Sequence, residues 1–358
     1  MSVFKRQDWF LYGSVFFLAL ASLVGIMSGA SELFPEQLIW FALAFGIIFL
    51  LSNVDMRPII NYRSYLLGAY LISLVLLLST LFFAPVIREA QSWLVFGSFQ
   101  FQPSELMKIG LVIFLAYFFA RRHIGIAHVR NIAISFVYVA LPMGILFLQP
   151  DWGSALVLFL VWVGFLFVSG IRWHHLAIGF FLCLLLGVVA WMFFLAPYQK
   201  ERIIGFLEPS YDPLGINYSS IQARIAIGSG GFLGKGFQRG TQTQLGFLPE
   251  PGTDFIFASF IEEWGFLGGL LILGAFFTMI FRIVTIGLRS SDTFSQLVCL
   301  GTAILFLSEF MLNVGSTIGL LPIIGVTFPF LSYGGSSLLT KAMLIGIIQN
   351  ISSRRSFS

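Results

Sequence analysis

The stretch LPEPGTDFIF, residues 248–257, ends a long polar segment and leads into apolar sequence, with Asp254 at the junction. The polar segment as a whole, Tyr198–Trp264, interrupts a chain that is otherwise nearly continuous hydrophobic helix sequence. A carboxylate at the lip of a membrane is energetically expensive, and such residues are functional by default. The sequence therefore predicts a membrane protein whose chemistry occurs at this segment, with the apolar helices holding it against the bilayer.

The composition supports a membrane protein. Of the 358 residues, 58% are hydrophobic and only 10% are charged, whereas soluble domains carry about 25% charged residues. The apolar residues form runs of roughly 20, the length that crosses a bilayer core. We predict an all-α polytopic membrane protein, residues 1–358 forming one domain with ten transmembrane helices. The predicted helices are 9–29, 36–52, 64–84, 103–120, 131–148, 153–170, 174–195, 254–282, 294–314 and 333–351.

Basic residues set the predicted orientation. Ten helices place both termini on one side, and the short loops of the other side carry only Arg88. The ends on the side of the termini carry Lys5, Arg6, Arg57, Arg63, Arg121, Arg122, Arg130, Arg172, Arg282, Arg289, Arg354 and Arg355. Cytoplasmic loops are enriched in Lys and Arg. Both termini are therefore predicted to be cytoplasmic, and the large loop at 196–253, between helices seven and eight, to be extracytoplasmic. The net charge of +4 reflects this topology and anionic lipid, not nucleic-acid binding.

Several residue types that often mark sites are interpreted as structural. Cys183 and Cys299 lie inside apolar runs, where free cysteines are usually core residues. The histidines have no partner at zinc-ligand spacing; they are His123, His128, His174 and His175. The glycine-rich run 228–236 is not a P-loop, because Gly236 stands where Ser or Thr is required. We predict flexible turns there.

Two further outer segments are predicted to have defined structure. Residues 85–102 are rich in aromatic side chains, which indicates a segment lying in the membrane interface or re-entering it. Residues 315–336 are uncharged and rich in Gly and Pro. Irregular backbone at membrane depth is tolerated only where protein or a cavity covers it, so this segment is predicted to wall a cavity open to the outer leaflet.

Charges predicted inside the membrane or at its lip are the strongest indicators of function. They are Glu105, Lys108, Asp151, Asp254, Glu262, Glu263, Glu309 and Lys341. Glu105 and Lys108 share one helix face and form either a local ion pair at a helix start or, as we predict, a polar cluster at the floor of an outward cavity. Asp151 is a plausible partner for Lys108. Glu309 and Lys341 are predicted to pair across two helices, and Glu263 to pair with another helix.

Asp254 has two interpretations that spacing alone leaves open. It is either an acid at a helix N-terminus, stabilised by the helix dipole, or a carboxylate placed to accept a proton from a sugar hydroxyl. The loop cations are equally open. Arg202, Arg224 and Lys235 suit the phosphate oxygens of a lipid diphosphate, or they keep the loop solvated.

Several motifs together resemble one family, the SEDS family (shape, elongation, division and sporulation), over nearly the whole chain. The motifs are QPSE (102–105), the run from Arg202 through DPLG (212–215), AIGSGG (226–231), LPE (248–250) with TDFIF (253–257), and PFLSYGGSS (329–337). Compact termini and the run GLLPIIG (319–325) are more similar to the RodA branch than to the FtsW branch.

The resemblance implies a peptidoglycan glycosyltransferase that polymerises lipid II during cell elongation, in the bacterial inner membrane with its active site facing outward. It implies that Asp254 is the catalytic residue and that Glu105, Lys108 and Asp151 belong to a cavity network below it. Substrate contacts are expected from Thr253, Ser336 and Ser337. A divalent cation, Mg²⁺ or Mn²⁺, is expected to assist, with no organic cofactor. The expected partners are a class B penicillin-binding protein and other elongation-complex membrane proteins.

The chemistry implied by the family fits these residues. An α-linked lipid diphosphate donor that yields a β-1,4 bond requires inversion in one displacement, with one base and stabilisation of the leaving group. Asp254 is the predicted general base for the acceptor 4-hydroxyl, and Arg202, Arg224 and Lys235 or a divalent cation would hold the diphosphate. Two alternatives remain: a flippase for lipid-linked precursors, in which the intramembrane charges matter most, and a non-catalytic scaffold for a transpeptidase.

Overall fold

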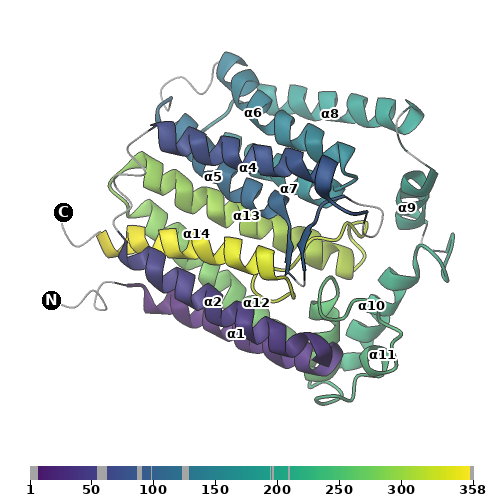
Figure 1. Cartoon of the computed structure of the whole chain (residues 1–358). Helices are drawn as coiled ribbons and strands as arrows, with labels where there is room; N and C mark the ends of the chain where they lie inside the picture. The colour runs from purple at the N-terminus through teal and green to yellow at the C-terminus, as the bar shows by residue number, and fades with distance from the viewer. Residues whose placement is uncertain are drawn as a thin grey trace.

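The structure is a computed structural model, and it describes residues 7–54, 63–86, 91–97, 99–122, 129–193, 195, 197–208 and 210–354. Several basic residues used to predict the orientation lie outside these ranges, namely Lys5, Arg6, Arg57, Arg88 and Arg355. The long apolar helices run side by side as a bundle, and the polar segment gathers at one end of it (Figure 1). This arrangement puts the predicted functional segment on a single end of the molecule.

Within the described residues, every predicted apolar run coincides with a helix. The long helices are α1 (Trp9–Gly29), α2 (Phe34–Asn53), α4 (Arg63–Phe83), α5 (Pro103–Ala120), α6 (Val129–Leu148), α7 (Trp152–Val168), α8 (Trp173–Phe193), α12 (Ile256–Leu288), α13 (Thr293–Thr317) and α14 (Gly335–Arg354). Their starts follow ordinary capping rules. Asp8, Asp151 and Asp292 each accept a backbone N–H at the N-terminus of a helix, as side-chain oxygens do at N-caps.

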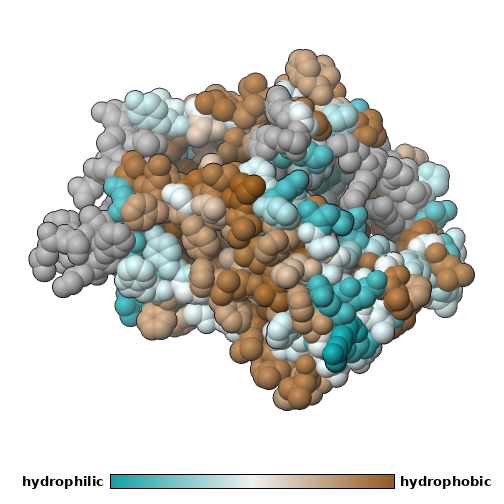
Figure 2. Space-filling model, turned by 60° about the horizontal axis from the view of Figure 1, so that its bottom comes forward, coloured by the Kyte–Doolittle hydropathy of each residue, from teal (hydrophilic) through white to brown (hydrophobic). Residues whose placement is uncertain are grey.

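The bundle is that of a polytopic membrane protein. In the described part of the chain, seven helices are long and apolar enough to cross a membrane, and α7 is a shorter apolar helix. Large hydrophobic side chains such as Phe16, Phe49 and Ile72 are exposed on the outer helices. Hydrophobic residues cover much of one face of the molecule (Figure 2). An apolar surface of this extent would be a liability in water, but it suits a helix bundle surrounded by lipid.

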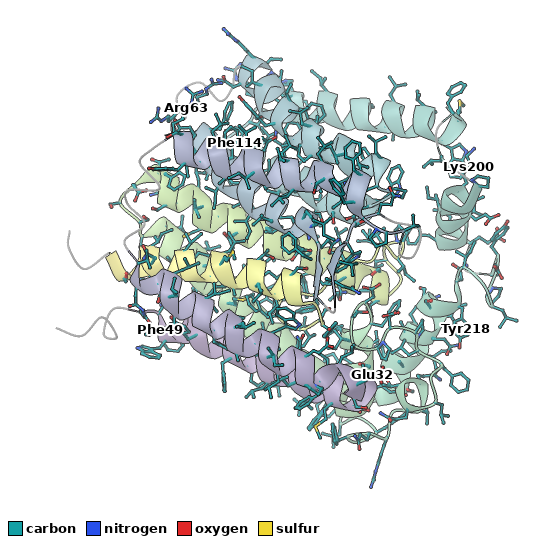
Figure 3. The ribbon with its side chains drawn as sticks, viewed as in Figure 1. Glu32, Phe49, Arg63, Phe114, Lys200 and Tyr218 are labelled. Carbon is teal, nitrogen blue, oxygen red and sulfur yellow. The ribbon has the colours of Figure 1, made fainter. Side chains whose placement is uncertain are left out.

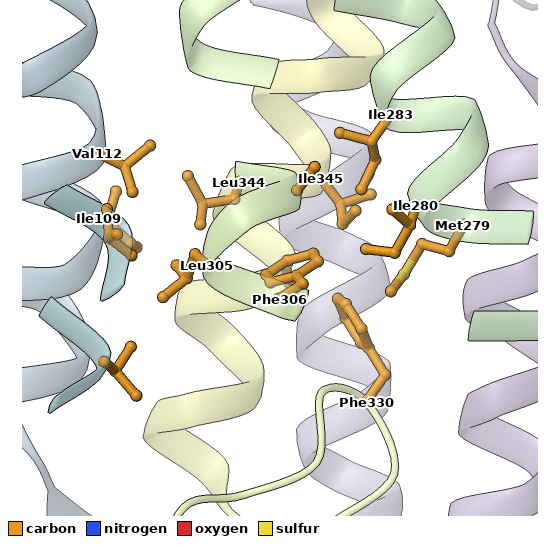
Figure 4. Packing of buried hydrophobic residues seen from close by; sticks show 14 of the residues in the cluster. Ile109, Val112, Met279, Ile280, Ile283, Leu305, Phe306, Phe330, Leu344 and Ile345 are labelled. Atoms are coloured by element: carbon orange, nitrogen blue, oxygen red, sulfur yellow. The ribbon is translucent and has the colours of Figure 1, made fainter. Parts of the chain in front are cut away.

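Helix α5 lies at the centre of the bundle, and 78% of its residues are buried. It packs against α4, α7, α13 and α14. Ile109 and Val112 of α5 face Leu305 of α13 in a core that continues to α12 and α14 (Figure 4). The two charged residues near the start of α5 are therefore carried on the most enclosed of the candidate spans.

The end of the bundle that holds both termini is tied by polar contacts. The guanidinium of Arg282 in α12 donates to both carboxylate oxygens of Asp8, which caps α1. Gln349 of α14 bonds the backbone N–H and C=O of the same Asp8. Phe49 and Arg63 mark this end, whereas Lys200 and Tyr218 lie at the opposite end (Figure 3).

The structure adds two features to the predicted all-α chain with one large loop. Residues 94–101 form a short antiparallel hairpin of β1 (Leu94–Phe96) and β2 (Phe99–Phe101). The long loop contains three helices of its own: α9 (Pro197–Leu207), α10 (Tyr218–Gly230) and α11 (Thr241–Gln244). Helix α10 packs against α12 and α13, and α11 packs against α10, α12 and α1. Most of the polar segment is thus an ordered layer on the bundle end.

Helix α12 is broken at Gly265, whose φ of 70° and ψ of −173° are not helical. The break releases backbone groups on both sides. The glycine-rich turn at 231–236 bonds them: the N–H groups of Lys235 and Gly236 donate to the C=O groups of Glu262 and Glu263. In the other direction, the N–H groups of residues 266 and 267 donate to the C=O groups of residues 231 and 232.

The predicted turn is present at residues 231–233, after the end of α10 at Gly230, and its backbone is hydrogen-bonded to α12. A Cβ on Gly230 or Gly234 would overlap the backbone carbonyls of Ile261 or Glu263. Glycine is required at these positions because only it permits the two backbones to approach this closely. The glycine-rich run that is similar to a nucleotide-binding loop in fact hydrogen-bonds the backbone groups on both sides of the break in α12.

The break supplies a stability test. Replacing Gly265 with alanine forces a Cβ onto a residue at φ 70° and against the backbone of Gly234, which costs at least about 2 kcal/mol. We expect a lower thermal unfolding midpoint for the detergent-purified Gly265→Ala variant. The matched control is Gly274→Ala in the same helix, where nothing lies within 4 Å of the added Cβ. Equal midpoints for the two variants would contradict the assigned role of the break.

Candidate active site at the outer end of the bundle

The segment around Asp254 is a tight turn rather than the first turn of a helix. Glu250 has a positive φ of 49°, and its C=O accepts the N–H groups of Thr253 and Phe255 at 3.2 and 3.3 Å. The Thr253 hydroxyl donates to Glu250 Oε2 at 3.1 Å. Prolines 249 and 251 flank this residue and restrict the backbone on both sides. The turn thus presents its last residues in a defined conformation.

Asp254 is not the cap of the helix that follows. Helix α12 begins at Ile256, its N-cap is Phe255, and no side chain caps it. The half-buried carboxylate instead faces the uncharged segment 318–334, since a Cβ on Gly325 would lie 3.8 Å from Asp254 Oδ2. Asp254 therefore lies two residues before the first residue of α12, where the turn meets the segment 318–334.

The turn is fastened to the segment 318–334 through backbone groups. Ser332 Oγ donates to the C=O of Thr253 at 2.7 Å and accepts the N–H of Phe328 at 2.9 Å. The N–H of Tyr333 donates to the C=O of Gly252 at 2.9 Å. Two stretches about 80 residues apart in the chain thus form one hydrogen-bonded unit.

Asn313 of α13 completes this unit. Its side-chain Nδ2 donates to the C=O of Asp254 at 3.0 Å and to the C=O of Val326 at 2.8 Å. The side chain is almost fully buried, with 1% of its surface exposed. Both amide hydrogens are therefore used to hold the two segments together.

Four charged residues form a buried cluster between α5, α13 and α14. Lys108 Nζ lies 2.7 Å from Glu105 Oε1 and 2.8 Å from Glu309 Oε1. Lys341 Nζ lies 3.2 Å from Glu309 Oε2. All four side chains are buried, and the two acids balance the two bases. The predicted pairing of Glu309 with Lys341 is confirmed, and Glu309 proves to join both lysines.

The cluster connects to the Asp254 unit through hydroxyl groups. Lys341 Nζ donates to Thr327 Oγ1 at 3.1 Å and also to Ser337 Oγ. The hydroxyls of Thr327 and Ser337 lie 3.1 Å apart. Lys341 of the cluster thus bonds Thr327, and Asn313 bonds the preceding residue, Val326. Ser336 is buried, and its hydroxyl has no hydrogen-bond partner among the described residues.

Asp151 is not the partner of Lys108, and that prediction is wrong. Its Oδ1 caps α7 by accepting the N–H of Ser154 at 3.0 Å, and its Oδ2 accepts from Gln102 at 3.3 Å. Lys108 instead pairs within its own helix and across to α13, because Glu309 projects toward it from the adjacent helix. Asp151 thus links the outer ends of α5 and α7, beside the cluster rather than in it.

Of the three predicted loop cations, the structure describes the side chains of Lys235 and Arg224. Lys235 lies 2.9 Å from the fully buried Glu262, which also accepts the N–H groups of Gln242 and Thr243 and fastens α11 to α12. Arg224 is exposed on α10 beside Gly319, and the side chain of Arg202 lies outside the described residues. Glu263 accepts from Ser28 of α1 at 2.5 Å, so its predicted pairing with another helix is confirmed.

Three residues in this unit were not singled out by the sequence: Asn313, Thr327 and Ser332. The signal available was weak, since all three are neutral and polar, and two lie in the uncharged segment 315–336. A buried asparagine in an apolar helix was nevertheless a detectable anomaly. The neutral residues that hold this unit together are thus harder to detect in the sequence than the charged residues near it.

Fold and site together define a polytopic membrane protein with a polar unit around Asp254 at one end of its helix bundle. The family of cell cycle proteins that comprises FtsW, RodA and SpoVE matches residues 4–356. The chain therefore belongs to the SEDS family.

Related proteins cover most of the chain. The peptidoglycan glycosyltransferase MrdB of Escherichia coli K12 is 35% identical over 313 residues, covering 87% of this chain and 84% of that protein. Stage V sporulation protein E of Bacillus subtilis is 36% identical over 325 residues, covering 88% and 86%.

Solved structures agree. A chain from a peptidoglycan synthase complex, solved to describe the coordination of polymerization and crosslinking, superposes with a TM-score of 0.85 at 33% identity, covering 98% of this chain and 99% of that one. The rod shape determining protein RodA of Thermus thermophilus gives a TM-score of 0.73 at 28% identity, with 98% of each chain covered.

The charge balance of the cluster is testable. Glu309→Gln leaves Glu105 to face two buried lysines, and an uncompensated buried charge costs about 3–5 kcal/mol. We expect a large fall in the thermal unfolding midpoint. The double variant Glu309→Gln with Lys341→Met leaves the Glu105–Lys108 pair neutral overall, so it should recover part of that loss, which is a coupling measured by a double-mutant cycle.

The control for this test is Glu32→Gln, which removes an acid from the exposed 3-10 helix η2 (Ser31–Leu33). It should change stability by less than about 0.5 kcal/mol. If the double variant is no more stable than Glu309→Gln, charge balance is not what holds the cluster.

Proposed function

We propose that this chain is a peptidoglycan glycosyltransferase that polymerises lipid II into β-1,4-linked glycan strands, with Asp254 as the general base. The observation that carries the proposal is the half-buried Asp254 carboxylate in the turn before α12, whose backbone C=O is held by Asn313. The names of the related proteins support the reaction class. A fixed carboxylate at the outward end of a membrane bundle suits a substrate that is half lipid and half sugar.

The reaction requires one displacement at the anomeric carbon of the donor. In the proposed step, Asp254 accepts the proton of the GlcNAc 4-hydroxyl of the acceptor as its oxygen attacks, and lipid diphosphate leaves from the opposite face. A base must lie within hydrogen-bond reach of the proton that it removes, so its backbone has to be fixed. The bonds to Asn313 and Ser332 supply that rigidity on either side of the residue.

A divalent cation, Mg²⁺ or Mn²⁺, is proposed to assist. Among the described residues, no group of three or more His, Cys, Asp or Glu is arranged to hold a metal. Mg²⁺ is commonly bound by one or two carboxylates together with substrate phosphates, and Glu250 and Asp254 are the carboxylates of the turn. Glu250 would hold the ion jointly with the diphosphate, whose negative charge the ion would neutralise; Asp254 would stay unbound to the ion, because a carboxylate that binds it loses basicity.

The wider setting is proposed from the same relatives. The bundle would cross the bacterial inner membrane ten times as one domain, with cytoplasmic termini and the segment 196–253 outside. One relative is a chain of a peptidoglycan synthase complex, which supports a class B penicillin-binding protein as partner. Action during cell elongation follows from the likeness to RodA and MrdB. Thr253, Ser336, Ser337 and the loop cations remain candidates for substrate contact.

The decisive test is polymerisation of lipid II by the purified chain, alone and together with its transpeptidase. We expect wild type to form glycan and Asp254→Asn to form none, because the amide cannot accept the proton; loss of a general base costs about 100-fold or more. The amide keeps the size of the side chain, so fold and monodispersity should be unchanged.

The matched control for that test is Glu208→Gln, which neutralises an exposed acid of the same outer segment and should polymerise at the wild-type rate. Equal polymer from wild type and Asp254→Asn would remove the base assignment while keeping an enzyme. No polymer from wild type under any condition would favour the flippase, which is then tested by lipid II movement across vesicles.

Cation dependence is a separate prediction. Chelation with EDTA should abolish polymerisation, and added Mg²⁺ or Mn²⁺ should restore it, because the ion is proposed to neutralise the negative charge of the diphosphate leaving group. The check is the initial rate across a titration of each ion after chelation. Full activity in EDTA would show that protein cations alone stabilise the leaving group.

A further inference from the structure

Asn313 is a polar residue at a buried helix position where packing alone would favour an apolar side chain. It projects from the interior of α13, and its two amide hydrogens bond two carbonyl oxygens in different segments, at Asp254 and Val326. The side-chain Oδ1 is buried and has no hydrogen-bond partner among the described residues. A helix residue kept for packing alone would be apolar, since burying an amide that is only partly satisfied is unfavourable.

The backbone at Asp254 needs an external support. Asp254 comes before the N-cap Phe255, so it lies outside the part of the chain that the helix holds. The direction of its side chain follows from the orientation of its own peptide unit, and that unit is planar and rigid. A hydrogen bond to the Asp254 C=O therefore limits rotation of the peptide that follows the carboxylate, and with it the direction of the side chain.

We propose that Asn313 is a positioning residue that fixes Asp254 for the reaction, by holding its carbonyl and the carbonyl of Val326 at one amide. The inference rests on the proposed function of Asp254 as the base. Val326 belongs to the segment that the Asp254 carboxylate faces at Gly325. Asn313 thus sets both the orientation of the base and its separation from the wall beside it.

The geometry demands asparagine. An aspartate at 313 would set a carboxylate against two carbonyl oxygens, and a leucine would offer no donor to either. A glutamine keeps both donors but displaces them by one methylene, so it tests position without removing polarity. A base displaced by about 1 Å loses about 100-fold in rate, whereas binding of the lipid and sugar elsewhere should be little affected.

The chain provides a matched control in Asn350 of α14. It is also a buried asparagine whose Nδ2 donates to backbone carbonyls, those of Leu51, Ser52 and Val54, and its Oδ1 likewise has no hydrogen-bond partner in the described part of the chain. Asn350 is near the C-terminal end of α14, and that end of the helix lies at the end of the bundle that holds both termini (Figure 1). Asn350→Ala therefore removes equivalent hydrogen bonds without touching the site.

The experiment measures initial rates of polymerisation against lipid II concentration for full-length wild type, Asn313→Ala, Asn313→Gln and Asn350→Ala, with thermal unfolding midpoints for each. We expect both alanine variants to lose stability. Only the position-313 variants should lose kcat, by about 100-fold, with KM within about twofold of wild type. The split between kcat and KM separates positioning from general loosening of the bundle.

Three outcomes would overturn the proposal: wild-type kcat in Asn313→Gln, an equal fall in kcat for Asn313→Ala and Asn350→Ala, or loss of folding in both position-313 variants. The last outcome would assign Asn313 to the fold alone. The comparison with Asp254→Asn keeps the two hypotheses apart. If Asp254→Asn is inactive and Asn313→Gln is normal, the positioning role fails and the base assignment stands; if Asp254→Asn is active, the base assignment itself fails.

Discussion

Backbone that leaves a helix inside an apolar bundle must obtain its hydrogen bonds from the protein, because hydrocarbon supplies none. The outer end of this chain meets that requirement twice. At Gly265 the groups released by the break in α12 bond the glycine-rich turn. In the irregular segment 318–334, backbone groups bond the turn around Asp254 and the side chains of Ser332 and Asn313. The candidate site is thus built from two irregular segments that hydrogen-bond each other's backbone groups. The same hydrogen bonds make the site rigid.

The buried charges obey a parallel rule in electrostatics. Removing a carboxylate or an ammonium group from water costs several kcal/mol per ion, which is offset only when partners are close and well placed. Here each acid contacts a lysine, and Glu309 contacts two. Any substrate group that reached the cluster would have to replace one of these ion pairs. The bonds from Lys341 to Thr327 and Ser337 connect the cluster to the segment that faces Asp254.

Hydrophobic runs predicted the helices well because run length and polarity are local properties of the sequence. The run 9–29 matches α1 at both ends, and 103–120 matches α5. Helix α12 was placed at 254–282 but extends from Ile256 to Leu288 and breaks at Gly265. That break depends on a turn about 30 residues earlier in the chain, so no local pattern reveals it. The same reason explains why Glu105 was found and its contact with Glu309 through Lys108 was not, and why Asn313 went unnoticed.

The distribution of fixed contacts along the bundle bears on what the protein does. A transporter needs contacts at each end that open in turn as a site is exposed alternately to the two sides. In this structure the end with the termini is joined by Asp8, Arg282 and Gln349, and the middle by the charge-balanced cluster. The exposed and polar groups gather instead at the opposite end, where α10 and α11 cover α12. A fixed backbone at the Asp254 carboxylate suits a reaction confined to one end of the bundle, because a base gains from being held still and a gate does not.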